Sequence, residues 1–102
     1  MLFACSLEAR LPTANLARAY RIVVSEDLFG QYTVDVTFGR IGTRGTVKRC
    51  SVTEIGAVRA KLRQVLKRRM TAPRRLGVAY HCRSVFDPQG WLAEDGLELI
   101  AA

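Results

Sequence analysis

One short run of the chain combines residue types that contact nucleic acids. From Phe38 to Gly45 it places an aromatic side chain and the arginines Arg40 and Arg44 among three glycines. Arginine binds phosphate oxygens through its planar fork, and an aromatic ring can stack on a base or a sugar. The run therefore predicts a nucleic-acid contact. Phe38 also continues the alternate apolar positions of a strand, which is equally typical of a core residue.

The spacing of the glycines argues against a nucleotide-cofactor loop. They follow the pattern G-x-x-G-x-x-G, whereas a dinucleotide loop carries G-x-G-x-x-G and opens directly into a helix. Here the next residues, 46–52, are rich in β-forming types, so the element after the glycines is a predicted strand. We therefore expect a β-hairpin at this position and no cofactor.

The charge of the chain is strongly segregated. The 102 residues include 16 lysines and arginines against 9 acidic residues, which gives a formal net charge of +7. Residues 40–75 hold twelve bases and one acid, whereas residues 86–102 hold four acids and no base. The basic block indicates an anionic partner such as a nucleic acid, with a solvated arginine-rich face as the alternative. The acidic tail could also lie on this block and mask it.

Apolar periodicity predicts an α+β fold. Strands with alternating apolar residues are expected at 20–25 and 32–38, a further strand at 46–52 because it is rich in β-forming residues, and another at 78–85 after Gly77. A helix is expected between the third and fourth strands. The predicted architecture is a small antiparallel β-sheet with one main helix packed across its apolar face.

The predicted helix spans residues 53–70. Apolar residues recur at helical spacing from Ile55 to Leu66, and Ser51 with Glu54 has the form of a capping box that begins the helix. Three bases step along one flank at intervals of four, which makes them either candidate phosphate contacts or a solvated helix face. These bases are Arg59, Arg63 and Lys67.

The two ends of the chain are predicted as separate segments. Residues 1–18 show no clear period and contain the turn formers Pro12 to Asn15, so we expect a loosely ordered N-terminal arm. Residues 86–102 form an acidic and apolar C-terminal tail, in which Asp95-Gly96 favours a small hairpin over residues 91–100. The domain itself would then span residues 19–85.

Candidate catalytic and metal-binding residues are few. His81 is the single histidine, and adjacent residues in a strand face opposite ways, which disfavours a pair with Cys82. The three cysteines lack zinc-finger spacing, and zinc bound by Cys50, His81 and Cys82 would require the fold to bring them together. We therefore predict that the chain is not an enzyme and that it holds no metal.

The hydropathy pattern predicts no membrane contact. No apolar run reaches the roughly 20 residues of a membrane span, and Leu2 to Ala4 is too short for the core of a secretion signal. The expected compartment is therefore the cytoplasm.

The predicted strands and the glycine run together resemble the WGR domain family. The resemblance covers about residues 19–85, and it is carried by Tyr20-Arg21-Ile22-Val23, Tyr32-Thr33-Val34, Phe38-Gly39-Arg40-Ile41-Gly42-Thr43 and Gly45. The family is named for a Trp-Gly-Arg triplet at the end of a strand, and it occurs in DNA-dependent poly(ADP-ribose) polymerases and in short bacterial proteins. Here Phe38 replaces the tryptophan, which keeps a stacking face but loses the indole N–H.

The resemblance implies a DNA contact near a strand break through Phe38, Gly39 and Arg40. Further candidates on the same hairpin follow from charge and proximity, not from the family motif, and they are Arg44, Lys48 and Arg49. Nothing of the polymerase activity carries over, because the chain is too short to contain that domain.

Two functions are therefore compatible with the sequence. The first is a DNA-binding module that favours ends or nicks, with RNA as the other polymer that phosphate pairing would accept. The second is a protein-interaction module that docks through residues 38–40 or through the apolar residues of the tail. Those tail residues are Trp91, Leu92, Leu97, Leu99 and Ile100.

Overall fold

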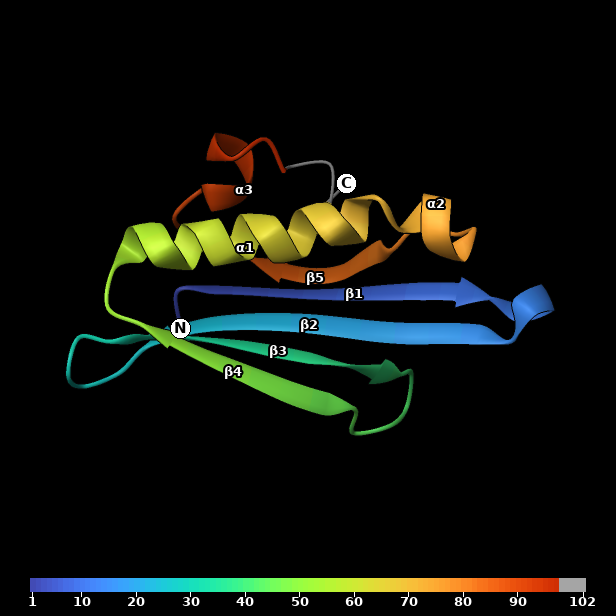
Figure 1. Ribbon diagram of the computed structural model, residues 1–102, viewed down its shortest axis with the longest axis horizontal. Helices are drawn as coiled ribbons and strands as arrows, with labels where there is room; N and C mark the ends of the chain where they lie inside the picture. The colour runs from blue at the N-terminus through green and yellow to red at the C-terminus, as the bar shows by residue number, and fades with distance from the viewer. Residues whose placement is uncertain (98–102) are drawn as a thin grey trace.

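A sheet and a helix form two layers in the computed structural model, which describes residues 1–97 (Figure 1). In chain order the elements are β1 (Phe3–Leu11), the 3-10 turn η1 (Pro12–Ala14), β2 (Leu16–Glu26), β3 (Tyr32–Arg40), β4 (Thr46–Val52), α1 (Ile55–Met70), α2 (Ala72–Leu76), β5 (His81–Phe86) and α3 (Trp91–Glu94). The strands pair antiparallel in the order β4-β3-β2-β1-β5. Helix α1 lies across one face of this sheet, so the predicted α+β architecture is confirmed.

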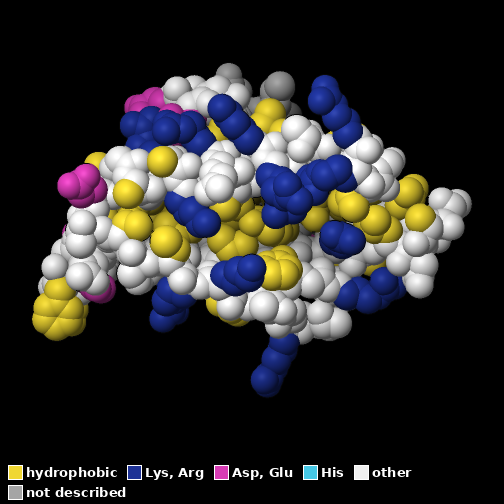
Figure 2. All heavy atoms as spheres, viewed as in Figure 1, with side chains coloured by type: hydrophobic (Ala, Val, Ile, Leu, Met, Phe, Trp, Pro, Cys, Tyr) yellow, Lys and Arg dark blue, Asp and Glu magenta, His cyan; other side chains and the backbone are white. Residues whose placement is uncertain are grey.

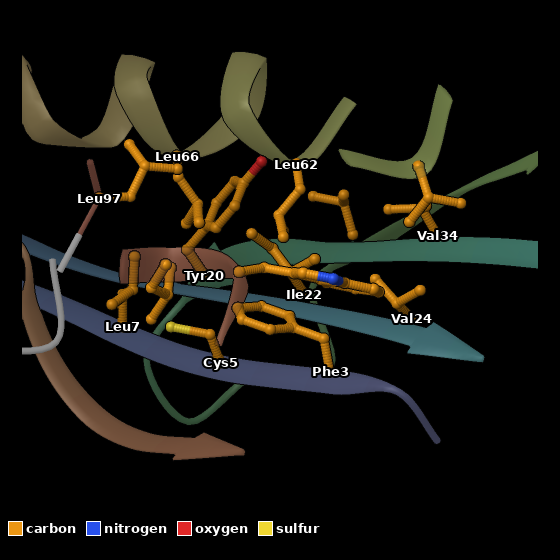
Figure 3. Close-up of a cluster of buried hydrophobic side chains, with 14 residues drawn as sticks. Phe3, Cys5, Leu7, Tyr20, Ile22, Val24, Val34, Leu62, Leu66 and Leu97 are labelled. Carbon is orange, nitrogen blue, oxygen red and sulfur yellow. The ribbon is translucent and has the colours of Figure 1, made fainter. Parts of the chain in front are cut away.

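The core lies between α1 and the facing side of the sheet (Figure 3). Phe3 of β1, Ile22 of β2 and Val34 of β3 are at most 1% exposed, and they meet Leu62 and Leu66 of α1. Each fully buried side chain of this kind contributes about 1.5–3 kcal/mol relative to an exposed one. Because side chains alternate along a strand, the residues between these positions form the opposite face of the sheet.

Strand β1 replaces the expected loosely ordered arm. Phe3, Cys5, Leu7 and Ala9 are buried and alternate with more exposed residues. The strand lies between β2 and β5 and pairs with β2 along its whole length. The prediction of an arm over residues 1–18 is wrong because the turn formers belong only to η1, which connects two long strands.

The middle of the chain follows the predicted order of elements. Strands β2 and β3 extend the predicted ones by a few residues, and β4 has the predicted bounds. Helix α1 ends where predicted but begins at Ile55. The prediction of a capping box is wrong. Ser51 pairs with Thr33 in the sheet, and the N-cap residue Glu54 makes no side-chain capping hydrogen bond.

The C-terminal segment completes the core instead of forming a hairpin. The fourth predicted strand is β5, shifted to residues 81–86 by the short helix α2. The Asp87 carboxylate accepts the N–H groups of Trp91 and Leu92 at 3.0 Å each and so begins α3. Both of these residues and Leu97 are buried. The expected hairpin over residues 91–100 is wrong as far as residue 97, and its last three residues lie outside the described part of the chain.

Candidate nucleic-acid interface

A groove of about 850 Å³ opens between α1 and the part of the sheet formed by β2, β3 and β4. Figure 2 shows this face of the molecule, where lysine and arginine side chains stand on both sides of a strip of apolar atoms. Strands β2 and β3 position its floor, because their alternate residues continue to face the helix side beyond the fully buried core.

Three aromatic rings are in contact with one another in this groove. The rings of Tyr20 and Phe38 stack with centroids 6.5 Å apart and an interplanar angle of 25°. Tyr80 meets the Tyr20 ring edge-on at 6.4 Å. Tyr20 is 5% exposed, whereas Phe38 is half-buried and packs against the core. Phe38 therefore packs against the core, as one of its two interpretations predicted, and it also lines the groove.

Two cations lie over these rings. The Lys48 Nζ atom is 5.7 Å from the centroid of the Phe38 ring, and the guanidinium carbon of Arg69 is 4.1 Å from that of Tyr20. Both distances lie within the range of cation–π attraction. Burial raises the pKa of the Tyr20 hydroxyl, and the opposing effect of Arg69 is smaller. The phenol is therefore neutral near pH 7 and adds no negative charge to the groove.

Further cations border the groove from the turn before β2 and from both layers. Arg40 donates hydrogen bonds to the backbone oxygen of Asn15 at 3.2 Å and to its side-chain Oδ1 atom at 3.1 Å. Asn15 ends η1 with a φ of 51°, so the β1–β2 connection fixes the direction of Arg40. Arg18 and Lys61 also border the groove. Among residues 1–97, no carboxylate lines it.

Arg49 also borders the groove, but it differs from the other cations because its guanidinium group forms an ion pair with a carboxylate. Its Nε and Nη2 atoms donate to the two carboxylate oxygens of Asp35 at 2.7 and 3.0 Å. The two residues are directly opposite each other in β3 and β4, on the sheet face away from α1. The hydrogen bonds from Arg49 lower the pKa of Asp35, so this pair is fully charged at neutral pH.

The glycine run forms the predicted turn between β3 and β4. A Cβ atom on Gly39 would lie 2.7 Å from the Cα atom of Gly45, closer than side chains allow. Gly45 has a φ of 71°, and a Cβ atom there would lie 2.5 Å from the Phe38 carbonyl oxygen. The two glycines thus let the ends of the turn come together directly beside Phe38 and Arg40.

Arg44 is placed on the other side of this turn. It borders a smaller hollow of about 220 Å³, together with Arg21 and Arg83, on the sheet face away from α1. Arg44 therefore does not line the groove, although Phe38 and Arg40 border both hollows.

The bases on the predicted flank of the helix are also separate from the groove. Arg59 Nη2 lies 2.9 Å from both Glu94 Oε2 and Asp95 Oδ1, and Arg63 Nη1 lies 3.3 Å from the same Asp95 oxygen. The Asp95 side chain is 5% exposed, so these arginines fix α3 against α1. Lys67 is exposed and does not line the groove.

The structure thus divides the nine predicted site residues. Those that border the groove are Phe38, Gly39, Arg40, Lys48 and Arg49. The bases that the sequence reasoning missed are Arg18, Lys61 and Arg69. The sequence does contain a pattern that could have identified Lys61 and Arg69. Together with Val65 they are spaced by four residues and so share one face of α1.

The fold separates the residues of the alternative zinc site. Cys50 lies in β4 and Cys82 in β5, and these strands are the opposite edges of the sheet. Across residues 1–97 there is no cluster of three or more metal-ligating side chains, and no helix is long and apolar enough to span a membrane.

Together the fold and the groove define an α+β binding module with a basic recognition surface. The family model of the WGR domain matches residues 3–71, so the chain belongs to the WGR domain family. A comparison with curated proteins returns no match. WGR domains are binding domains rather than catalytic ones, and those of poly(ADP-ribose) polymerase-like proteins generally bind nucleic acids. The matched residues include the glycine turn, α1 and every groove cation.

Proposed function

We propose that this WGR domain binds DNA in the groove between α1 and strands β2–β4. The observation that carries the proposal is the composition of the groove, in which an aromatic floor is bordered by five cations on the helix side of the sheet and, among residues 1–97, by no carboxylate. The five cations are Arg18, Arg40, Lys48, Lys61 and Arg69.

The cations supply most of the affinity. Each phosphate that they neutralise releases condensed counterions from the DNA, and that release favours binding. Among residues 1–97, none of these five cations has a carboxylate within ion-pair distance. They therefore do not have to break an internal ion pair before they meet a phosphate, and Arg40 is already held in one direction by Asn15.

The aromatic floor supports the preference for ends or nicks. Phe38 is half-buried and borders the groove directly, so part of its ring is available to a ligand. An intact duplex hides its base faces, whereas a break leaves a terminal sugar and base on which a ring can pack. Helix α1 follows strand β4, and α2 after it has only five residues, so residues 1–97 hold no helix-turn-helix pair with a recognition helix for the major groove. We therefore expect shape and phosphate contacts to dominate over sequence.

The alternative of protein docking through the tail loses three of its five apolar residues, because Trp91, Leu92 and Leu97 are buried against the core. Leu99 and Ile100 lie outside the described residues. Docking through the face of residues 38–40 is distinguished from DNA binding by its response to salt. An apolar protein contact responds weakly to salt, whereas DNA affinity falls with a slope of about −0.9 per neutralised phosphate in a plot of log affinity against log salt.

The first experiment is fluorescence anisotropy at low and moderate salt with three labelled ligands, namely a nicked duplex, an intact duplex and a single strand. We expect binding that weakens steeply with salt and that is tightest for the nicked duplex. Absence of binding to all three ligands at low salt would overturn the proposal.

A matched pair of lysine variants tests the groove itself. Lys61 and Lys67 lie on the same helix, but only Lys61 borders the groove. Lys61→Gln should lower duplex affinity several-fold and reduce the salt slope by about one, because one phosphate contact is lost. Lys67→Gln makes the same change in net charge and should leave affinity nearly unchanged. Equal losses for both variants would show that net charge, rather than the groove, determines binding.

A further inference from the structure

The turn between β2 and β3 presents two large apolar side chains to solvent. Leu28 is 98% exposed and Phe29 is 90% exposed, and they are the two most exposed large apolar residues in the described part of the chain. Adjacent side chains of this size seldom remain uncovered in a soluble domain unless they contact a partner.

Hydrogen bonds hold this turn in one conformation. The Asp27 Oδ1 atom accepts the N–H groups of Phe29 at 2.8 Å and of Gln31 at 2.9 Å. The Asp27 N–H donates to the Gln31 carbonyl at 2.8 Å, and Gly30 N–H donates to the Asp27 carbonyl at 3.3 Å. A turn that is already ordered loses little conformational entropy when its apolar side chains are buried by a partner.

The charge around the turn determines which partner fits. Glu26 and Asp27 precede the two apolar residues, and the sequence has no lysine or arginine between residues 22 and 39. A nucleic-acid backbone or an anionic membrane would be repelled. The complementary surface is an apolar hollow bordered by cations, which is also the description of the groove between α1 and β2–β4.

We propose that the Leu28–Phe29 turn docks into the basic groove of a second copy of this chain. The turn lies at the end of β3 opposite to the glycine turn (Figure 1), so it projects away from the groove of its own chain. The groove volume of about 850 Å³ lies in the range of sites that enclose drug-sized ligands, of roughly 300–1,000 Å³. The aromatic floor would cover the apolar side chains, and the bordering cations would face Glu26 and Asp27.

This contact would make self-association and DNA binding mutually exclusive. The association follows from the turn and the groove alone, and only the competition rests on the proposed DNA binding. Because both ligands use the same groove, each lowers the apparent affinity of the other by a factor that grows with the competitor's concentration relative to its own dissociation constant.

The association is tested by analytical ultracentrifugation of the full chain over a range of concentrations at low salt, without nucleic acid. We expect the average mass to rise with concentration. Phe29→Ser should weaken the association by about tenfold or more, as removal of a central apolar anchor does. Phe86→Ser is the matched control, since Phe86 is also exposed, at 46%, but lies in β5. A monomer at every concentration, or equal effects of the two variants, would overturn the proposal.

Mixing two defective variants tests the pairing of turn and groove. Lys61→Glu changes only the receiving groove, and Phe29→Ser changes only the inserted turn. Each variant alone should remain largely monomeric, whereas an equimolar mixture should associate through the intact turn of one and the intact groove of the other. No association in the mixture would contradict the pairing.

Anisotropy with the nicked duplex separates this proposal from the proposed function. At low protein concentration Phe29→Ser should bind the duplex as the unmodified chain does, and at high concentration the duplex should dissociate the wild-type assembly. Loss of duplex affinity in Phe29→Ser would overturn the docking proposal, because the turn would then contact DNA. Association that persists while no duplex binds would overturn only the proposed function.

Discussion

At the scale of single residues, the glycine turn determines whether Phe38 and Arg40 are presented together. Gly42 and Gly45 both have positive φ values, of 88° and 71°. A Cβ atom at Gly42 would meet no other atom within 4 Å, whereas at Gly45 it would lie 2.5 Å from the Phe38 carbonyl oxygen. An alanine in place of Gly42 would therefore strain the backbone only, whereas an alanine in place of Gly45 would also clash with the Phe38 carbonyl oxygen.

We predict that alanine at these two positions has different costs. Gly42→Ala should lower the free energy of unfolding by about 1 kcal/mol, the cost of a left-handed conformation for a non-glycine residue. Gly45→Ala should lower it by about 3 kcal/mol, because the β3–β4 turn must open to avoid the clash. Urea unfolding of both variants measures the difference. Equal costs would show that the close contact beside Phe38 relaxes freely.

The Asp35–Arg49 pair predicts a pH dependence. The pKa of Asp35 is lowered in the folded state by its hydrogen bonds to Arg49, so the pair stabilises the fold above the unfolded pKa of about 4 and this contribution is lost as pH falls through the folded value. Asp35→Asn should therefore be less stable than wild type at pH 7, and the difference should shrink below about pH 4. Urea unfolding midpoints of both proteins at pH 7 and below about pH 4 measure this difference. A difference that stays constant with pH would exclude the charged pair as its source.

At the scale of elements, α3 has a structural role that the acidic composition of the tail conceals. The Trp91 ring stacks with that of Phe3 at a centroid distance of 6.3 Å. The Asp95 carboxylate is nearly buried and accepts hydrogen bonds from Arg59 and Arg63. As far as residue 97, the acidic tail does lie on basic residues, but on Arg59 and Arg63 at the flank of α1 and not over the groove.

Removal of this element should unfold the domain rather than expose its basic surface. Trp91→Ala should cost about 3–5 kcal/mol, as other large core truncations do. Asp95→Asn should cost about 2 kcal/mol, because Arg63 loses its carboxylate partner and Arg59 keeps only the more exposed Glu94. Thermal unfolding followed by circular dichroism measures both. A folded, stable Trp91→Ala variant with increased DNA affinity would instead support a masking tail.

The elements also show what the sequence could and could not reveal. Strands β2 to β4 and helix α1 follow from strong local periodicity. Phe3, Cys5, Leu7 and Ala9 have the same alternation, but Ala4 on the other face and the adjacent turn formers weaken the signal. The capping box failed because strand pairing competes with helix capping for Ser51, and sequence spacing alone does not decide that competition.

The candidate site was predictable only in part for a related reason. Phe38, Arg40 and Lys48 are close in sequence and belong to one hairpin, so local reasoning places them together. Arg18 and Arg69 reach the same groove from the beginning of β2 and from the end of α1. Their convergence depends on how the helix crosses the sheet, which residue spacing does not specify.

At the scale of the whole molecule, the net charge of +7 destabilises the free protein and would stabilise its proposed complex with DNA. In the free protein the groove cations repel one another, and added salt screens that repulsion over a distance of about 10 Å at 0.1 M. In the proposed DNA complex the same cations would be neutralised by phosphates, and added salt would weaken the complex.

These opposite effects give a prediction for thermal stability. At low salt, nicked duplex at a hundred times its dissociation constant should stabilise the fold by about 2.7 kcal/mol, because the ligand binds only the folded chain. The melting temperature of the free protein should rise with salt and that of the complex should fall, so the two values converge. Lys61→Gln should reduce the low-salt shift more than Lys67→Gln does, since only Lys61 borders the groove. Melting temperatures that rise in parallel with salt, with and without duplex, would mean that the charge of this domain is not neutralised by DNA.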